Sequence, residues 1–262
     1  MNKSILHMDL DTFFVSVERL LDSSLVTKPL LVGGTGDRGV VAACSYETRK
    51  FGINSGMSMR MAQKLCPEAT CIKGNSGTYM KYSTIVTDII KSEVPLFEKT
   101  SVDEFYVDLT GMDRFYGNYK FAKQLRHKII NESGLPISFG LSENKVVSKV
   151  ATGEAKPNNQ IKIDYGFEKP FLAPLSVRKI PMVGNAVGQI LMNLGVFQVK
   201  QLQDMPIELM VSVLGKNGHK IWERANGIDT SPIIPYSERK SISIERTYDR
   251  DTIDMDKLKN TL

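Results

Sequence analysis

Cysteine and long apolar runs are scarce in this chain of 262 residues. The three cysteines, Cys44, Cys66 and Cys71, are an odd number at scattered positions, without the second pair or the nearby histidine that would complete a zinc site. We therefore expect reduced thiols, as in cytoplasmic proteins, rather than a disulfide framework. No run approaches the roughly twenty apolar residues of a membrane-spanning helix, and the first residues do not resemble a secretory signal peptide. The sequence thus predicts neither membrane association nor secretion.

The composition that is present is that of a soluble globular protein, because 42% of the residues are hydrophobic and 24% are charged. The length suits two or three domains rather than one core. The formal net charge of +5 and the isoelectric point near 8.9 are mildly basic. This charge permits a polyanionic partner such as nucleic acid without requiring one.

Acidic residues occur at two places where strands are predicted. Asp103 and Glu104 are adjacent in residues 101–108, a run of β-branched and aromatic residues that is typical of a strand. Neighbouring side chains of a strand point to opposite faces, so these carboxylates converge only where the chain twists or turns, as at the head of a hairpin. Asp9 and Asp11 follow a short apolar run near the amino terminus. Two strand-borne acidic clusters are what a pair of divalent cations needs from a fold.

The order of the predicted elements brings the two acidic clusters together. Strands are expected at residues 5–8, 96–100, 105–109, 136–141 and 161–163, and helices at 76–92, 119–132 and 144–155. This is a β-α-β-β-α-β order with one further αβ unit, which indicates a ferredoxin-like sheet. In such a sheet the first strand lies beside the middle hairpin, so that Asp9, Asp103 and Glu104 form one site.

Residues 11–74 are predicted to form an insertion into this sheet. Asp11 or Thr12 is expected to cap a helix with an apolar stripe of Phe13, Val17, Leu20 and Leu21. Further along the insertion, strands are expected at 29–34 and 39–44 and short helices at 45–51 and 58–66.

The rest of the chain is predicted to be mainly helical. Helices are expected near 175–179, through 190–194 and from about 214 to 227, with a turn at 180–185. Residues 241–248 alternate as a strand would, and a helix is expected from 254 to the end. Because one strand and one helix cannot bury a core of their own, we expect the chain to stop inside a domain.

Together these motifs resemble the Y family of translesion DNA polymerases, and most of all its DNA polymerase IV branch, from Ile5 to about Thr247. The resemblance implies an α+β fold with a ferredoxin-like palm, an inserted small α/β fingers domain, a helical thumb with a helix-hairpin-helix, and the beginning of an α/β little-finger domain. The implied limits are 2–10 and 75–165 for the palm, 11–74 for the fingers, 166–233 for the thumb, 234–241 for a linker and 242–262 for the little finger.

The resemblance assigns the metal and nucleotide sites residue by residue. Asp9, Asp103 and Glu104, with the carbonyl of Leu10, would hold two Mg²⁺ ions and carry the catalysis. The positions that hold the incoming triphosphate fall on Tyr46, Arg49 and Lys156. The residue types agree with this role, because an arginine fork and a tyrosine hydroxyl suit phosphate oxygens and a lysine at a helix end provides a point charge.

Phe14 matches the aromatic residue that selects the sugar of the nucleotide. Phe13 lies on the apolar stripe of its helix, which leaves Phe14 to face a ligand, although Phe13 stays a candidate. A helix-hairpin-helix binds DNA phosphates through backbone N–H groups. The implied DNA contacts are Ile180, Val183, Gly184, Lys216 and Gly218. Two residues depart from the family pattern: Ala43 replaces a threonine near the triphosphate, and Met182 replaces the first glycine of the hairpin.

The resemblance therefore implies a template-directed DNA polymerase that performs translesion synthesis by two-metal phosphoryl transfer, with low fidelity, low processivity and no proofreading. Its partners would be primer-template DNA and deoxynucleoside triphosphates, with a sliding clamp bound by a tail that we expect this chain to lack. We expect a cytoplasmic monomer. Two alternatives stay open: a palm-type nucleotidyl cyclase, which uses a similar acidic hairpin, and an inactive DNA-binding scaffold. The basic helical segment argues against the first, and the intact acids argue against the second.

Overall fold

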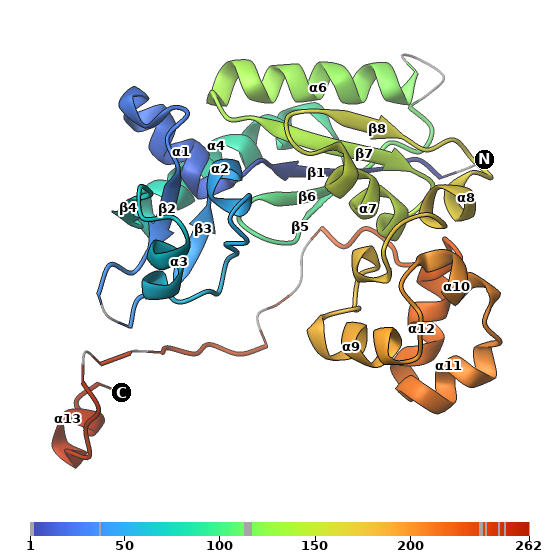
Figure 1. Cartoon of the computed structure of the whole chain (residues 1–262). Helices are drawn as coiled ribbons and strands as arrows, with labels where there is room; N and C mark the ends of the chain where they lie inside the picture. Colours follow the sequence, from blue (N-terminus) through green and yellow to red (C-terminus); the bar gives the residue numbers. More distant parts are fainter. Residues whose placement is uncertain are drawn as a thin grey trace. The chain divides into compact units, whose positions relative to one another are not determined.

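The computed structural model describes residues 3–36, 38–112, 117–235, 238, 240–245, 247–248 and 250–261. The predicted domains and elements also include residues 2, 37, 113–116, 236, 237, 239, 246, 249 and 262, and at these positions the predictions lie outside the described residues. Two compact units are present, Met1–Asp11 with Ser83–Pro235 and Thr12–Tyr82 with Tyr236–Leu262, and each is described by itself (Figure 1). None of the described helices is both long enough and apolar enough to span a membrane.

The first unit contains a five-stranded sheet. In sheet order its strands are β5 (Phe97–Lys99), β6 (Glu104–Asp108), β1 (Ile5–Leu10), β7 (Ile137–Ser142) and β8 (Gln160–Lys162). The first strand thus lies between the β5–β6 hairpin and β7, and it is antiparallel to both β6 and β7. This order confirms the predicted ferredoxin-like arrangement.

Helices cover both faces of this sheet (Figure 1). Helix α6 (Asn118–Ser133) packs on one face, where the rings of Tyr119 and Phe139 are 6.1 Å apart. Helix α7 (Lys145–Ala155) packs on the other face, where Thr152 is hydrogen-bonded to His7 at 2.8 Å. The end of helix α4 (Ser76–Glu93), which begins in the second unit, also belongs to the first. The predicted strands of this sheet and the helices predicted at 76–92, 119–132 and 144–155 are therefore confirmed within two residues at each end.

A glycine on β7 allows α7 to approach the sheet closely. A Cβ atom at Gly140 would lie 2.2 Å from the carbonyl oxygen of Ser148 and 2.6 Å from the amide nitrogen of Thr152. Because both atoms belong to the backbone of α7, a side chain at this position can be accommodated only if the helix moves away from the sheet.

We expect Gly140→Ala to lower the free energy of unfolding by about 1–3 kcal/mol, as overpacking of a core does. Gly153→Ala is the matched control on α7, because Gly153 is exposed and a Cβ there meets no atom within 4 Å. That control should be neutral or should stabilise the helix by about 0.5–1 kcal/mol. Urea denaturation of both variants measures the difference, and equal stabilities would contradict the close packing.

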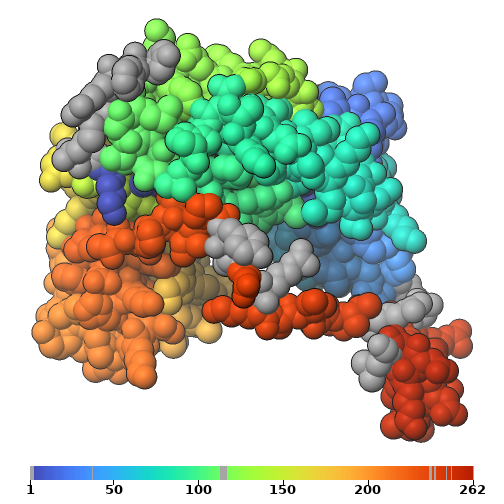
Figure 2. All heavy atoms as spheres, turned by 180° about the vertical axis from the view of Figure 1, so that it is seen from behind, coloured from blue at the N-terminus to red at the C-terminus, as the bar shows by residue number. Residues whose placement is uncertain are grey.

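A segment of short helices completes the first unit. It consists of α8 (Glu168–Leu172), the 3₁₀ turn η2 (Val177–Lys179), α9 (Asn185–Asn193), α10 (Val199–Asp204), α11 (Ile207–Leu214) and α12 (Lys216–Ala225). Its buried residues form one core with Val147 and Val150 of α7. The chain leaves this segment over the surface of the same unit, where Glu98 accepts the backbone N–H of Ile234 at 2.7 Å (Figure 2). The sequence did not predict α8, α10 or α11, and it predicted η2 as a helix.

The turn between η2 and α9 contains a non-glycine residue in the left-handed region. Met182 has φ 80° and is exposed, and the buried Ile180 and Val183 anchor the turn on either side. The strain explains why a glycine is common at such positions, since a Cβ in the left-handed region costs about 1 kcal/mol or more.

Met182→Gly should therefore raise the free energy of unfolding of this unit by about 1 kcal/mol. Met182→Ala keeps the Cβ and should give no gain, which separates relief of backbone strain from removal of the exposed side chain. Chemical denaturation of the three proteins is the measurement. A gain of equal size with alanine would exclude the backbone explanation.

The second unit is built on a three-stranded sheet in the order β3 (Val41–Cys44), β2 (Leu30–Gly33) and β4 (Thr70–Lys73). Its helices are α1 (Phe13–Leu21), α2 (Tyr46–Arg49), α3 (Met59–Leu65) and the first turns of α4, with a 3₁₀ turn η1 (Ser23–Leu25). Strand β4 was not predicted, because its four residues TCIK carry only a weak alternating pattern and are stabilised by parallel pairing with β2.

Two details of the predicted helix α1 are wrong. Its apolar stripe does not extend to Leu20 and Leu21, which are exposed, whereas Phe13, Val15 and Val17 are buried. Thr12 occupies the N-cap position of α1, yet its side chain makes no capping hydrogen bond to the helix. The carboxylate of Asp11 accepts a hydrogen bond from Ser138 instead. Tertiary contacts thus replaced the expected local cap.

The predicted strand at 241–248 is not formed by any of its described residues. Ile242 and Ile244 are 91% and 78% exposed. An alternating pattern yields a strand only where a neighbouring strand pairs with it, and no described residue pairs with this stretch. The helix expected after it is present as α13 (Met255–Lys259), and Asp254 caps it through the N–H groups of Asp256 and Lys257. The three cysteines are free thiols, as predicted.

Candidate functional site

The acidic residues that were predicted to share a site lie at one end of the five-stranded sheet. Asp9 on β1 is directly opposite Glu104 on β6, and directly opposed residues of an antiparallel pair share a face. Asp103 precedes β6, and its carbonyl oxygen accepts the backbone N–H of Leu10 at 3.0 Å. Strand pairing therefore brings the two acidic clusters together as predicted.

Each of the three carboxylates is bonded to a neighbouring side chain. The contacts are Asp9 Oδ1 with Lys156 Nζ at 2.5 Å, Glu104 Oε1 with Lys149 Nζ at 2.5 Å, and Asp103 Oδ1 with the hydroxyl of Ser101 at 2.6 Å. Among the described residues, no three His, Cys, Asp or Glu side chains are arranged as a metal cluster requires. The backbone thus places the acids side by side, while their oxygens are turned toward ammonium and hydroxyl groups.

The charge of Asp9 is sensitive to its surroundings. The pKa of the Asp9 carboxyl is raised to about 7, because burial and the nearby carboxylates of Asp103 and Glu104 raise it by more than the adjacent ammonium of Lys156 lowers it. A carboxyl with such a pKa carries a proton in part of the molecules near neutral pH. A cation bound beside it favours the ionised form, so cation binding here would release a proton.

The donor set fits a hard divalent cation. Three carboxylates and the nearby main chain of Leu10 offer only oxygen, which is the ligand atom that Mg²⁺ and similar ions prefer. Asp9 and Glu104 keep 17% and 22% of their side-chain surface accessible, so an ion can reach them. The ammonium groups of Lys149 and Lys156 already bind here, which indicates that the site attracts positive charge.

Lys156 was predicted to hold a triphosphate, and the structure places it beside the acids. It is the C-terminal cap of α7, and its ammonium lies 2.5 Å from Asp9 and 3.9 Å from Asp11. Lys149 was missed. It lies seven residues earlier on α7, so both lysines project from the same side of that helix, and this spacing was the available signal. Only the packing of α7 against the sheet showed that Lys149 reaches Glu104.

The second unit carries the other predicted nucleotide residues. Tyr46 and Arg49 lie on the short helix α2, and the guanidinium of Arg49 is 5.1 Å from the centre of the Tyr46 ring. Ser45 caps this helix through the N–H of Thr48. Arg49 is exposed, so its guanidinium is accessible to an anion.

The two adjacent phenylalanines differ as the helical stripe predicted. Phe13 is 3% exposed, whereas Phe14 is half-buried and stacks on Tyr79 with ring centres 4.2 Å apart and 14° between the planes. The hydroxyl of Tyr79 donates to Glu18 at 2.5 Å, and burial followed by this contact raises the pKa of Tyr79 to about 12. Sequence reasoning missed Tyr79, because it is remote in the chain from Phe14.

The predicted DNA contacts in the helical segment differ in exposure. The side chains of Ile180 and Val183 are buried, and the N–H of Val183 donates to the carbonyl of Ile180. These two residues therefore shape the turn, while Gly184 stands exposed at the N-terminus of α9, where helix N–H groups lack intrahelical partners. Lys216 is exposed at the start of α12.

Gly218, which was also predicted as a DNA contact, lies where two helices pack together. It is buried, its N–H donates to the carbonyl of Gly215, and a Cβ there would lie 2.1 Å from the carbonyl oxygen of Met210. The glycine allows α12 to pack closely on α11. The structure thus shows a packing role for Gly218, and its assignment as a DNA contact stays a prediction.

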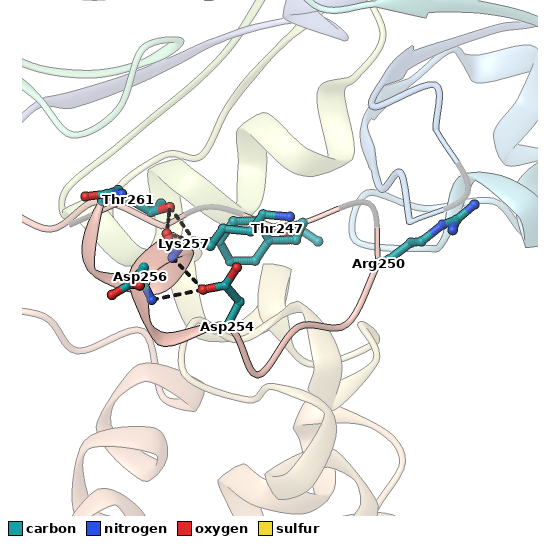
Figure 3. A pocket seen from close by; sticks show the side chains of 8 residues that line it. Thr247, Arg250, Asp254, Asp256, Lys257 and Thr261 are labelled. Atoms are coloured by element: carbon teal, nitrogen blue, oxygen red, sulfur yellow. Dashed lines mark hydrogen bonds between the residues drawn. The ribbon is translucent and has the colours of Figure 1, made fainter.

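A pocket near the carboxyl terminus shares no residue with the predicted sites (Figure 3). All of its lining residues come from 247–261, including Asp254 and Lys257. The hydroxyl of Tyr248 bonds Thr261 across it. This contact and the cap at Asp254 account for the local structure around α13.

Solved structures define the class of protein to which this architecture belongs. The crystal structure of DinB from Sulfolobus solfataricus superimposes with a TM-score of 0.81 and 25% identity, over 88% of this chain and 69% of that one. The insertion ternary complex of Dbh DNA polymerase superimposes with a TM-score of 0.79 and 24% identity over 88% of this chain and 69% of that one, a likeness that shows the fold alone. The fold is thus the palm, fingers and thumb of a Y-family DNA polymerase.

Sequence comparison identifies the family. Residues 8–153 match the model of the impB/mucB/samB family. DNA polymerase IV of Pseudomonas syringae pv. tomato is 34% identical over 255 residues, which are 97% of this chain and 72% of the relative. The chain belongs to this family, the Y family of DNA polymerases.

Two more relatives are likewise longer than this chain. DNA polymerase IV of Dehalococcoides mccartyi strain CBDB1 is 41% identical over 252 residues, and that of Streptomyces coelicolor is 39% identical over 255 residues. These alignments cover 95% and 96% of this chain, but 65% and 53% of the two relatives. The chain therefore spans about two thirds of the Dehalococcoides mccartyi relative. A DNA polymerase family implies dependence on a divalent metal ion.

Proposed function

We propose that this chain is a template-directed DNA polymerase that performs translesion synthesis, with primer-template DNA and deoxynucleoside triphosphates as substrates. The observation that carries the proposal is the cross-strand pair of Asp9 and Glu104, with Asp103 at the head of the β5–β6 hairpin. Three carboxylates at one sheet end, next to a lysine on a helix end, are suited to phosphoryl transfer.

Asp9, Asp103, Glu104 and the carbonyl of Leu10 would hold two Mg²⁺ ions. Bound there, the ions acidify the primer 3′-hydroxyl and neutralise the charge of the triphosphate and of the leaving pyrophosphate. The chain's own groups supply the remaining positive charge. Lys156 would exchange its contact with Asp9 for a phosphate oxygen of the triphosphate. In the second unit, Arg49 and Tyr46 would bind phosphate oxygens of a nucleotide.

The DNA would be held by the thumb through the exposed N-terminus of α9 at Gly184 and through Lys216. Contacts of this kind read the backbone and not the bases, which suits an enzyme that accepts damaged template. In this proposal the palm comprises residues 2–10 and 75–165, the fingers 11–74, the thumb 166–233 and a linker 234–241, and residues 242–262 belong to a little finger. Low fidelity, low processivity and absence of proofreading are part of the proposal, as are a monomeric state, a cytoplasmic location and a sliding clamp as partner.

Primer extension tests the proposal directly. Purified protein, an undamaged primer-template, the four deoxynucleoside triphosphates and Mg²⁺ should give primers longer by one or a few nucleotides, and chelation by EDTA should stop the reaction. A template with a damaged base should still be copied past the lesion. A cyclic nucleotide formed from triphosphate alone would support a cyclase instead, and DNA binding without extension would support a scaffold.

A further inference from the structure

The turn that follows Lys156 is held from two sides. The N–H of Asn158 donates to Asp11 Oδ2 at 2.7 Å. The guanidinium of Arg126, on α6, donates to the carbonyl oxygen of Asn158 at 2.6 Å and to its side-chain oxygen at 2.5 Å. Both main-chain polar groups of Asn158 are therefore engaged, two residues after the lysine.

Asp11 links this turn to the sheet. Its residue is 1% exposed, and the hydroxyl of Ser138 donates to both carboxylate oxygens, at 2.8 and 3.0 Å. Ser138 also accepts the N–H of Asn159 at 3.3 Å. The Lys156 ammonium lies 3.9 Å from the same carboxylate, which places a buried negative charge beneath the lysine.

The anchoring residues come from three elements that are far apart in sequence. Asp11 follows β1, Ser138 lies on β7 directly opposite Asp9, and Arg126 projects from α6. Arg126 is 7% exposed and also donates to the carbonyl of Ile137 at 2.8 Å. A buried arginine with three backbone and side-chain acceptors is a rigid support, since each acceptor restricts the planar guanidinium.

We propose that Asp11, Ser138 and Arg126 are positioning residues that hold the Lys156 turn, so that the lysine ammonium can move between Asp9 and a phosphate oxygen of the bound nucleotide without its backbone moving. This inference rests on the proposed function, in which Lys156 binds the triphosphate. The three residues touch neither substrate nor metal and act through Lys156 alone.

We expect the fixed backbone of the Lys156 turn to strengthen nucleotide binding. A lysine side chain has four rotatable bonds, and a fixed starting point limits the number of conformations that must be frozen when the ammonium meets a phosphate. Loosening the turn should weaken ground-state and transition-state contacts alike, which raises KM for the nucleotide more than it lowers kcat.

Ser138→Ala is the main variant, and Ser142→Ala is its matched control. Both serines are buried on β7 and lie on the same face, but Ser142 is opposite Ile5 at the far end of the strand and bonds Ser148 and the carbonyl of Asn144. Loss of one such hydrogen bond corresponds to a change of roughly fivefold in an equilibrium. We expect Ser138→Ala to raise KM for the incoming nucleotide about fivefold with kcat within about twofold, while Ser142→Ala changes neither.

Arg126→Lys is the second variant, because it keeps the positive charge and loses the fork that reaches two acceptors of Asn158. It should raise KM at least as much as Ser138→Ala. The thermal stability of every variant is measured as well. If Ser138→Ala and Ser142→Ala lose the same stability but only Ser138→Ala raises KM, the effect is due to positioning of the lysine and not to general destabilisation. An unchanged KM in both Ser138→Ala and Arg126→Lys would overturn the proposal.

A double-mutant cycle with Lys156→Met distinguishes the two proposals. If Lys156→Met leaves KM for the nucleotide unchanged, its assignment to the triphosphate has failed. If Lys156→Met raises KM and Ser138→Ala adds no further increase in that background, the serine acts through the lysine as proposed. If instead Ser138→Ala raises KM equally in both backgrounds, the lysine keeps its role and the positioning inference is wrong.

Discussion

Asp103→Ala should abolish nucleotide addition and leave the affinity for primer-template DNA within about threefold of the unchanged protein, because that affinity rests on phosphate contacts elsewhere. In the proposed mechanism the Asp103 carboxylate would be one of the ligands that hold the Mg²⁺ ions, and alanine offers no oxygen in its place. The structure predicts little cost to the fold. The side chain of Asp103 is half-buried and its carboxylate is bonded to Ser101, while the hairpin is held by main-chain contacts that alanine retains.

The control for this result is Asp108→Ala. Asp108 lies at the opposite end of β6, opposite Ile5, and accepts the N–H of Thr110. The Asp108→Ala substitution removes one carboxylate from the same strand and should leave primer extension intact. Single-turnover extension and DNA binding without added metal are the two measurements. Extension by Asp103→Ala within tenfold of the unchanged protein would remove Asp103 from the catalytic site.

Phe14→Ala should allow ribonucleotides into the product. A ring against the sugar excludes a 2′-hydroxyl by steric overlap. Such a clash in a packed site separates two substrates more strongly than a difference of one methylene group does, which changes kcat/KM by roughly 10–200-fold. The structure supports a fixed ring, because Phe14 stacks on Tyr79 and the hydroxyl of Tyr79 is held by Glu18. We therefore expect the preference for deoxynucleotides to fall by at least about 100-fold, with a much smaller loss of deoxynucleotide incorporation.

Phe13→Leu is the comparison for this variant. Since Phe13 is buried, its replacement should reduce stability and keep the sugar preference. The ratio of kcat/KM for a ribonucleotide and its deoxy counterpart measures the effect in both proteins. An unchanged ratio in Phe14→Ala, with a changed ratio in Phe13→Leu, would transfer sugar selection to Phe13.

The sequence predicted the features that depend on short stretches of chain. The apolar and β-branched runs at β1, β6 and β7 predicted strands, and the element order predicted a sheet in which Asp9 adjoins Glu104. The difference in burial between Phe13 and Phe14 followed from helical periodicity. The alternation at 241–248 predicted a strand that did not form, because a strand depends on a partner that no local pattern supplies.

The tertiary structure alone decided which side chains meet. Three such pairs are 32 to 65 positions apart in the chain, and only the packing of whole elements brings their side chains into contact. They are Lys149 with Glu104, Tyr79 with Phe14, and Arg126 with Asn158. The same holds for Gly218, whose buried contact with α11 appears only once the helices are packed. Periodicity assigns a residue to a face of its own helix or strand, but the residue that it meets there is set by the crossing of whole elements. For this reason the acids of the site could be found from the sequence, whereas the lysines and the buried network that hold them could be assigned partners only from the fold.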